Sequence, residues 1–168
     1  IVAIMDSDDV SHFKRFEKQL KVILNSKISI VGSNIEEFND KNNHRVIRKV
    51  PENHLKIFKM SKWRNPMNGA TLMFDKNAYI SSNGYPSNYH SFEDYELVTR
   101  FIEAGYQCHS LQDILYYART SELWIKRRSG LRYLIKEIKY ISTLFNKNYI
   151  NLFKFLINIL IRLILRLL

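Results

Sequence analysis

Apolar runs alternate with amphipathic stretches along the first 117 residues, and this alternation constrains the fold more than any other feature of the sequence. The runs that predict strands are residues 1–5, 28–32, 70–74 and 111–117. Apolar side chains at helical spacing predict helices over residues 13–24 and 93–104. Strands that alternate with helices favour a largely parallel α/β sheet, in which ligand sites gather at the carboxyl ends of the strands.

Positive charge is concentrated in the last quarter of the chain. The formal net charge is +10 over 168 residues, and from Lys126 onward ten Lys and Arg residues face a single acid, Glu137. The first 125 residues are close to neutral. We therefore expect two parts, a folded domain over residues 1–125 and a basic tail over residues 126–168.

The sequence opens with Ile1 rather than methionine, and its first residues lack a charged segment followed by an apolar stretch and a small-residue cleavage site, so we expect nothing in them to direct secretion. Ile1 opens an apolar run that predicts a buried strand, so we expect the chain to be a piece of a longer protein. A lone cysteine, Cys108, cannot form an internal disulfide. The missing secretion pattern and the lone cysteine both favour a reducing, cytoplasmic setting.

An acidic turn, Asp6-Ser7-Asp8-Asp9, follows the first predicted strand. Hard cations such as Mg²⁺ and Mn²⁺ prefer oxygen ligands, and two carboxylates at a strand end are able to supply them. The alternative is a plain polar turn in which Asp9 caps the next helix. Taken by itself, this short pattern favours the alternative.

Further motifs follow the acidic turn in a fixed order, and together they resemble bacterial family 2 glycosyltransferases of the GT-A fold. The motifs are Met5-Asp6-Ser7-Asp8-Asp9-Val10-Ser11, Asn65-Pro66-Met67-Asn68, Gly84-Tyr85, Glu93-Asp94-Tyr95-Glu96-Leu97, Tyr116-Tyr117-Ala118-Arg119 and Arg127-Arg128-Ser129-Gly130. Downstream of the first motif, Arg15, Glu17, Lys18 and Gln19 also match. The resemblance covers residues 1–133, and ordered agreement of several motifs is far more specific than any one of them.

The resemblance implies the C-terminal part of a GT-A (Rossmann-like) fold, an α/β fold whose mixed sheet is flanked by helices. It implies an inverting transferase that moves a sugar from a nucleotide-sugar donor to a saccharide or lipid-linked acceptor in bacterial surface polysaccharide synthesis. Mn²⁺ or Mg²⁺ would be the cofactor, with Asp8 as its direct ligand and Asp6 touching the ribose or sharing the metal. Such a cation stabilises the charge that develops on a departing diphosphate.

The acidic helix start, Glu93-Asp94, is the candidate for catalysis. A sugar hydroxyl is too weak an acid to attack unaided at neutral pH, so a positioned general base is needed. The resemblance favours Asp94 in this role, with Glu93 as its neighbour and helper, and direct attack inverts the anomeric centre. The alternative is that both carboxylates only stabilise the N-terminus of their helix.

Asn65, Asn68 and Tyr95 are candidate acceptor contacts. Residues 65–68 predict a loop beneath the acceptor, with simple turn formation as an equal alternative. On a helix Tyr95 projects differently from Asp94, which favours a packing role for its ring. Family members often carry His where this chain has Gly69, so the chain departs from the resemblance at this position.

Arg127 and Arg128 have two interpretations of equal weight. Guanidinium groups match phosphate oxygens, which predicts that these two residues bind the donor diphosphate. They also stand at the start of the basic tail, which predicts contact with anionic lipid.

The tail from residue 149 to residue 168 is almost continuously apolar, and its polar residues fall on roughly one third of a helix circumference. These residues are Asn151, Lys154, Asn158, Arg162 and Arg166. A spanning orientation would cost up to about 2.5–3.5 kcal/mol for each cation held at mid-bilayer. We therefore expect a helix in the membrane interface with its cations at anionic headgroups, which places the protein peripherally at the cytoplasmic face of the inner membrane. Packing on the domain or on a partner is the alternative.

Two further functions stay open on the sequence alone. Family members carry another segment before the first strand, so if the chain is complete the resemblance implies a catalytically inactive, membrane-bound interaction module. A basic nucleic-acid-binding protein is less favoured, because the basic residues alternate with Leu and Ile rather than with base-stacking aromatic residues. We therefore expect no nucleic acid among the partners.

Overall fold

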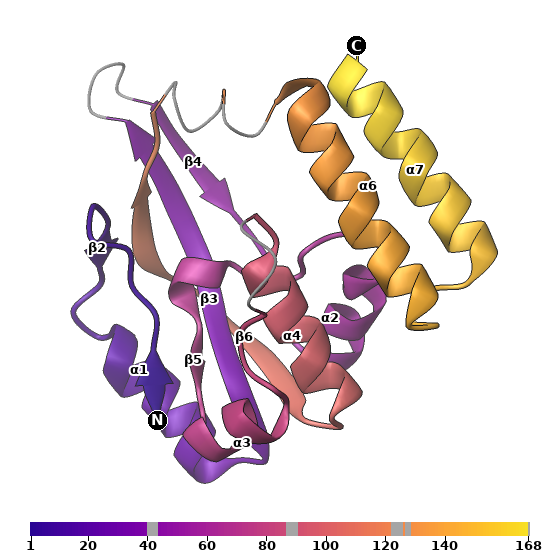
Figure 1. Ribbon diagram of the computed structural model, residues 1–168. Coiled ribbons are helices and arrows are strands. Elements are labelled where there is room, and N and C mark those ends of the chain that lie inside the picture. The colour runs from indigo at the N-terminus through magenta and orange to yellow at the C-terminus, as the bar shows by residue number, and fades with distance from the viewer. Residues whose placement is uncertain (40–43, 87–90, 122–125, 127–128, 168) are drawn as a thin grey trace. The chain divides into compact units, whose positions relative to one another are not determined.

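The computed structural model describes residues 1–39, 44–86, 91–121, 126 and 129–167. The chain divides into two compact units, Ile1–Arg119 and Thr120–Leu168. The first unit is a sheet with helices packed against it, and the second contains a pair of long helices (Figure 1).

A curled mixed sheet forms the first unit. Its strands are β1 (Val2–Ala3), β2 (Val10–Ser11), β3 (Ile28–Asn39), β4 (His44–Arg48), β5 (Met73–Phe74) and β6 (Gln107–Arg119). Neighbouring strands follow the order β1-β5-β3-β6-β2. β4 lies off this path and pairs with residues 35–39, the C-terminal end of β3. The predicted α/β class with a mixed sheet is confirmed.

Among the described strands, the one parallel pair is β3 with β6. The pairs β1–β5, β5–β3, β4–β3 and β2–β6 are all antiparallel. The expectation of a largely parallel sheet is therefore wrong. A parallel pair needs a long crossover, and here the helix-containing connection from β3 to β6 supplies it, whereas the short strands join the sheet in the opposite direction.

The two central strands are much longer than the apolar runs that predict them. β3 has 12 residues and β6 has 13. The outer half of β3 carries Glu36 and Glu37, which point to opposite faces of the sheet and form ion pairs with Arg45 and Arg48 of β4. Cross-strand pairing of opposite charges therefore extends the strand beyond its apolar run.

β1 lies at the edge of the described sheet, and its side chains are exposed. The apolar run at residues 1–5 predicts a buried strand, yet Val2 is 37% exposed and Met5 is 48% exposed. The prediction of burial is wrong because apolar composition favours a strand, whereas burial depends on which elements cover it.

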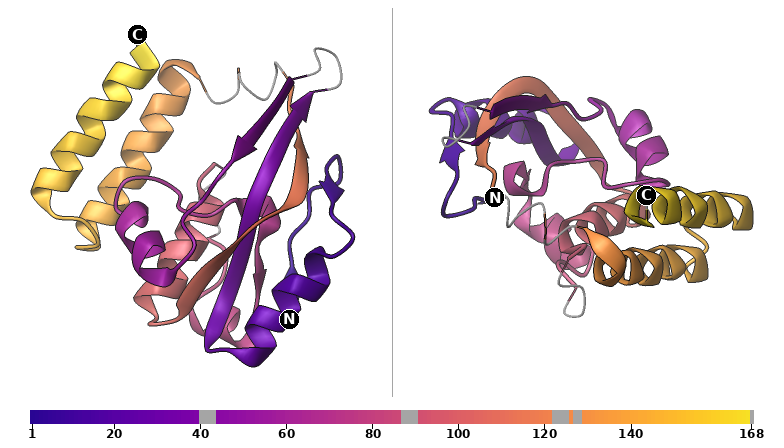
Figure 2. Two further views of the ribbon diagram at one scale, coloured as in Figure 1. Left: turned by 180° about the vertical axis from the view of Figure 1, so that it is seen from behind. Right: turned by 90° about the horizontal axis from the view of Figure 1, so that it is seen from above.

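The helices of this unit cover both faces of the sheet (Figure 2). They are α1 (Arg15–Asn25), α2 (His54–Ser61), α3 (Lys76–Ser81) and α4 (Glu93–Glu103), with a 3-10 turn, η1 (Gly69–Thr71), before β5. Ile23 of α1 packs against Val31 and Met73. The ring centroid of Phe101 in α4 lies 5.9 Å from the ring centroid of Phe74. Because consecutive strand residues point to opposite faces, contacts at Met73 and Phe74 place α1 and α4 on opposite sides of the sheet.

The second unit contains α6 (Gly130–Asn146) and α7 (Leu152–Leu167), which pack against each other as a hairpin. The polar stripe of α7 is directed toward α6. Arg166 donates to both carboxylate oxygens of Glu137 at 2.8 and 3.3 Å, and Arg162 Nε lies 4.0 Å from Glu137 Oε1. Asn158, in the same stripe, is 1% exposed. The expectation that these cations meet lipid headgroups is therefore not met by Arg162 and Arg166, which pair with an acid inside the hairpin.

The outer face of α7 is apolar. Its exposed large apolar residues are Leu152, Phe153, Leu156, Leu160, Ile161, Ile164 and Leu165. Among the described helices, none has both the length and the apolar character needed to cross a membrane.

Candidate functional site

The acidic turn is fastened through its main chain. The Ile4 N–H donates to the Leu72 carbonyl at 2.8 Å, which continues the pairing of β1 with β5. The Asp6 N–H donates to the hydroxyl of Tyr116 at 2.9 Å, and Arg119 Nε donates to the Asp8 carbonyl at 3.3 Å. The turn is thus held between the end of β6 and the segment that precedes β5.

Asp9 does not cap the following helix. Its Oδ1 accepts from the Arg119 N–H at 2.7 Å, so this carboxylate caps the end of β6 instead. β2 intervenes between the turn and α1, and the N-cap of α1 is Lys14, which makes no side-chain capping hydrogen bond. The capping alternative for Asp9 is therefore wrong.

Asp6 and Asp8 are exposed. No cluster of three or more His, Cys, Asp or Glu side chains able to hold a metal occurs within the described residues. Two exposed carboxylates nonetheless fit a hard cation that takes its remaining ligands from a diphosphate and water, as Mg²⁺ does in many phosphate-binding sites. The donor set is chemically suited to Mg²⁺ or Mn²⁺ in the presence of a nucleotide.

A buried arginine lies beneath the acidic turn. Arg15 is fully buried, its Nη2 donates to the Ile4 carbonyl at 2.7 Å, and its guanidinium lies 5.1 Å from the centre of the Tyr116 ring. Burial lowers the pKa of Arg15. Arg15 Nε donates to Gln19 Oε1 at 3.0 Å, and Gln19 Nε2 donates to the Thr71 carbonyl at 2.7 Å. Two side chains of α1 therefore connect the acidic turn to η1.

The loop before η1 is also tied into the core. Asn65 Oδ1 accepts from the Met67 N–H at 3.2 Å, which makes Asn65 a turn-forming residue. Asn68 Nδ2 donates to the Ser33 carbonyl at 2.9 Å, and Thr71 Oγ1 donates to the Asn68 carbonyl at 2.7 Å. Asn68 Oδ1 is buried and accepts no hydrogen bond from any described residue.

The Asp94 carboxylate lies directly over this loop. A Cβ added to Gly69 would fall 1.8 Å from Asp94 Oδ2, so the carboxylate occupies space that any other residue would fill. The hydroxyl of Tyr85 donates to Asp94 Oδ1 at 3.0 Å. Glu93 Oε2 is buried and, within the described part of the chain, accepts no hydrogen bond. The N-cap residue of α4, Phe92, makes no side-chain capping bond.

Among the other predicted site residues, Tyr95 lies in the core. Tyr95 is 4% exposed, and its hydroxyl donates to the Ser61 carbonyl at 2.6 Å, which favours the packing role over contact with an acceptor. Arg127 and Arg128 lie outside the described residues.

The strand register brings the segment that leads into the acidic turn close to η1. Val2 pairs with Phe74 and Ala3 with Met73, and Ile4 follows opposite Leu72. Continuing this antiparallel direction carries Asp6 toward η1, over whose first residue the Asp94 carboxylate lies. Asn68 and Asp94 therefore lie at η1, and the strand that leads into Asp6 runs alongside the residue that follows η1.

Several residues that build this region were not predicted to do so. Tyr85 and Tyr116 belong to the family motifs and Arg15 follows the first of them, but residue type and spacing predict no role for these three side chains. Their hydrogen-bond partners lie far away in the chain, and spacing along the sequence does not reveal such contacts. The motif positions themselves were the available signal.

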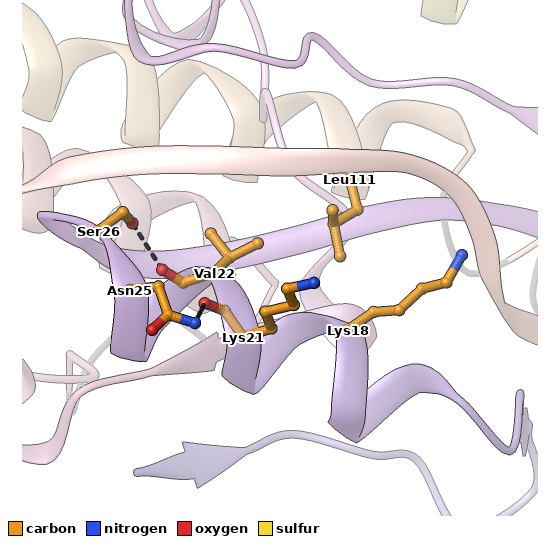
Figure 3. A pocket seen from close by; sticks show the side chains of 6 residues that line it. All are labelled: Lys18, Lys21, Val22, Asn25, Ser26 and Leu111. Atoms are coloured by element: carbon orange, nitrogen blue, oxygen red, sulfur yellow. Dashed lines mark hydrogen bonds between the residues drawn. The ribbon is translucent and has the colours of Figure 1, made fainter.

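A hollow lies beside α1 (Figure 3). It is lined by Lys18, Lys21, Val22, Asn25, Ser26 and Leu111. None of the predicted site residues is among them. Lys18 is paired with Asp113, and Asn25 and Ser26 bond back to the carbonyls of their own helix. The hollow therefore does not extend the candidate site.

Comparison with known proteins identifies several bacterial relatives. The chain is 35% identical over 170 aligned positions to the UDP-Gal:alpha-D-GlcNAc-diphosphoundecaprenol beta-1,3-galactosyltransferase of Escherichia coli, an alignment that covers 100% of this chain and 61% of the relative. The amylovoran biosynthesis glycosyltransferase AmsE of Erwinia amylovora is 28% identical, with 83% and 52% covered. The O-antigen biosynthesis glycosyltransferase WbnJ of Escherichia coli is 38% identical, with 61% and 39% covered. No protein-family model matches the chain.

The chain spans about half the length of the curated relatives that it matches. The resemblance predicted from the ordered motifs is confirmed by these relatives: the chain is related to bacterial glycosyltransferases over the part of their sequence that it spans.

Proposed function

We propose that this chain supplies the metal-binding and acceptor-binding part of an inverting glycosyltransferase in bacterial surface polysaccharide synthesis. Two observations support it: the strand that leads into Asp6 pairs with the segment directly after η1, and the Asp94 carboxylate at the start of α4 lies over Gly69, the first residue of η1. The name of the first relative gives UDP-Gal as donor and a diphosphoundecaprenol-linked sugar as acceptor. By analogy, the donor here is a nucleotide sugar and the acceptor a saccharide or lipid-linked saccharide.

On the donor side, Asp8 is the proposed direct ligand of Mn²⁺ or Mg²⁺, and Asp6 shares the metal or contacts the ribose. When bound, the cation supplies positive charge to the departing diphosphate. Tyr116 and Arg119 hold the main chain of the turn, so the two carboxylates project from a fixed backbone. Arg127 and Arg128 are proposed as additional diphosphate contacts, on sequence grounds alone.

On the acceptor side, Asp94 is the proposed general base. It takes the proton of the acceptor hydroxyl as that oxygen bonds to the anomeric carbon and the nucleoside diphosphate departs from the opposite face, which inverts the centre. Asn68 Oδ1 and Glu93 Oε2 are buried oxygens without a hydrogen bond from the described residues. Such a group costs about 1–3 kcal/mol. Donation from neighbouring sugar hydroxyls would remove that cost.

The test is a transfer assay with the purified gene product, UDP-galactose and a short-chain GlcNAc-diphospholipid. Asp8→Ala is expected to abolish stimulation by Mn²⁺. Asp94→Asn is expected to lower turnover by about 10²–10⁴-fold while the protein still binds UDP-galactose, because general-base catalysis contributes that much. Full activity in both variants would reject the proposal, and absence of transfer with this pair calls for other nucleotide sugars in the same assay.

We further propose that the α6–α7 hairpin seats the protein peripherally at the cytoplasmic face of the inner membrane. The outer face of α7 exposes Phe153 at 71% and Leu160 at 57%. Arg132, Lys136 and Lys139 are exposed on α6 at helical spacing. An apolar helix face accompanied by cations matches an anionic lipid interface, and each cation near such a surface is worth about 1 kcal/mol. This combination also favours lipid over nucleic acid as the partner.

Sedimentation with vesicles tests this proposal. Binding to phosphatidylglycerol vesicles is expected to exceed binding to phosphatidylcholine vesicles, and to fall at high salt. Replacing both Phe153 and Leu160 by Ser should abolish binding, whereas Ile47→Ser, at a residue 51% exposed on β4, should not. Unchanged binding in the double variant would reject the proposal. A dimer that dissociates in that variant would assign the face to a second copy of the chain.

A further inference from the structure

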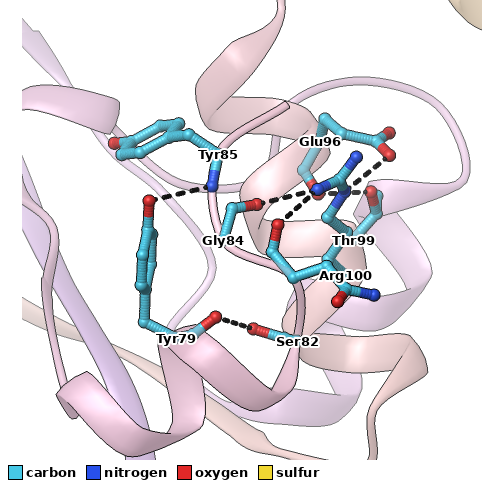
Figure 4. A network of polar contacts seen from close by, with 8 residues as sticks. Tyr79, Ser82, Gly84, Tyr85, Glu96, Thr99 and Arg100 are labelled. Atoms are coloured by element: carbon cyan, nitrogen blue, oxygen red, sulfur yellow. Dashed lines mark hydrogen bonds and ion pairs between the residues drawn. The ribbon is translucent and has the colours of Figure 1, made fainter. Parts of the chain in front are cut away.

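The turn between α3 and α4 is clamped at three points (Figure 4). Arg100 Nη1 donates to the Asn83 carbonyl at 2.6 Å and to the Gly84 carbonyl at 3.1 Å. The Tyr85 N–H donates to the hydroxyl of Tyr79 at 3.1 Å. One side chain from each helix therefore holds the backbone at residues 83–85 in place.

The two helices also restrict which residues the turn accepts. Gly84 has φ +47, in the left-handed region that favours glycine, and an added Cβ would fall 2.4 Å from the Tyr79 ring. Glu96, fully buried one turn before Arg100, accepts from Arg100 Nε at 3.0 Å. The Glu96 carboxylate orients the guanidinium that holds the turn.

With the backbone at residues 83–85 held in this way, the Tyr85 hydroxyl lies within hydrogen-bond distance of the Asp94 carboxylate. The hydroxyl donates to Asp94 Oδ1 at 3.0 Å, and Asp94 Oδ2 lies over the bare Cα of Gly69. Burial raises the pKa of Tyr85, and the charges of Asp94 and Glu93 together with the neighbouring Tyr79 raise it further. The phenol therefore stays protonated and remains a hydrogen-bond donor at neutral pH.

We propose that Tyr85 is a positioning residue for Asp94, held in place by the Glu96–Arg100 clamp, and that it fixes the carboxylate in one rotamer before the acceptor binds. The inference rests on the proposed role of Asp94 as the general base. Tyr85 keeps its proton throughout, and the proton of the acceptor hydroxyl goes to Asp94. A base oriented in advance loses less entropy on the way to the transition state.

Tyr85→Phe tests the inference, because it removes the hydroxyl and keeps the ring. Transfer turnover should fall about tenfold or more, since one preorganised donor at a catalytic group is worth at least that much. A hydrogen bond to the charged form lowers the pKa of a carboxyl group, so its loss should move the acid limb of the kcat/KM profile to higher pH. KM for UDP-galactose and the response to Mn²⁺ should not change. Tyr106→Phe, the same substitution at the far end of α4, is the matched control with wild-type behaviour expected.

Arg100→Lys provides a second route, because lysine keeps the charge but loses the fork that spans two carbonyls. It should reproduce part of the Tyr85→Phe defect, and the double variant should be no worse than Tyr85→Phe alone, since both act on one unit. Wild-type turnover in Tyr85→Phe, or reduced turnover with an unmoved acid limb, would overturn the inference. If Asp94→Asn stays active, the proposed function itself fails. An inactive Asp94→Asn beside a normal Tyr85→Phe rejects only the positioning role.

Discussion

The acidic turn after β1 and the acidic start of α4 carry the same kind of side chain in opposite surroundings. Asp6 and Asp8 are exposed, and Tyr116 and Arg119 bond to the main chain of their turn. Asp94 is only partly exposed, accepts from Tyr85 through one oxygen and covers Gly69 with the other. The first group has a fixed backbone with carboxylates open to solvent, and the second has a fixed carboxylate.

This difference matches the two tasks proposed for them. A hard cation binds carboxylates together with water and phosphate oxygens, so its ligands need access to solvent and to the nucleotide. A general base needs a defined distance and direction to one proton, so its side chain benefits from being held before the substrate arrives.

Gly69→Ala displaces the Asp94 carboxylate, and we expect it to lower transfer activity more than the other substitutions that test this difference. The new Cβ would occupy the place of Asp94 Oδ2, so the carboxylate must rotate away. Transfer should fall by about 10–100-fold, because a displacement of about 1 Å at a catalytic group costs that much. Stimulation by Mn²⁺ should be unchanged.

Gly105→Ala is the control for stability in that experiment. Gly105 has φ +83 and no atom within 4 Å of an added Cβ, so the change strains the backbone without touching the site. We expect a loss of about 1 kcal/mol in urea denaturation with normal turnover. Normal turnover in Gly69→Ala as well would show that the observed rotamer of Asp94 is not the one used in transfer.

Tyr116→Phe loosens the acidic turn rather than the base, and a smaller effect is expected. The Asp6 N–H loses its acceptor, at a cost of about 1 kcal/mol. The Mn²⁺ concentration for half-maximal transfer should rise about fivefold, the equivalent of that free energy. Turnover at saturating Mn²⁺ should stay near wild type. Tyr117→Phe is the neighbouring control, and an equal rise there would remove the special role of the Tyr116 hydroxyl.

Asp9→Asn should have the smallest effect on transfer activity. It tests whether Asp9 has a different role from Asp6 and Asp8, the proposed metal ligands. Asp9 Oδ1 accepts from the Arg119 N–H, and an amide oxygen accepts equally well. Activity and Mn²⁺ dependence should remain within about twofold of wild type, because only a neutral acceptor is required. Asp8→Asn, which removes a proposed metal ligand, is the contrasting variant. A large loss in Asp9→Asn would place Asp9 among the metal ligands.

Much of the fold follows from local patterns in the sequence. Helical spacing of Phe16, Leu20 and Ile23 predicts α1, and the apolar spacing from Glu93 to Ala104 predicts α4 to within one residue. The spacing gives no sign of α3, which begins after Asp75 because its carboxylate accepts from the Ala78 N–H at 2.8 Å. Capping by one polar residue is a weaker signal than a repeated apolar pattern.

The sequence alone determined the mixed α/β class, the resemblance to bacterial glycosyltransferases and the chemical types of the candidate residues, because these depend on residue identity and short-range order. Only the tertiary structure decided which residues meet. It engaged Asp9 with β6, placed Tyr95 in the core, joined Tyr85 and Gly69 to Asp94, and turned Arg166 toward Glu137. Each of these contacts depends on strand register and helix packing between distant segments, which no local pattern of residues encodes.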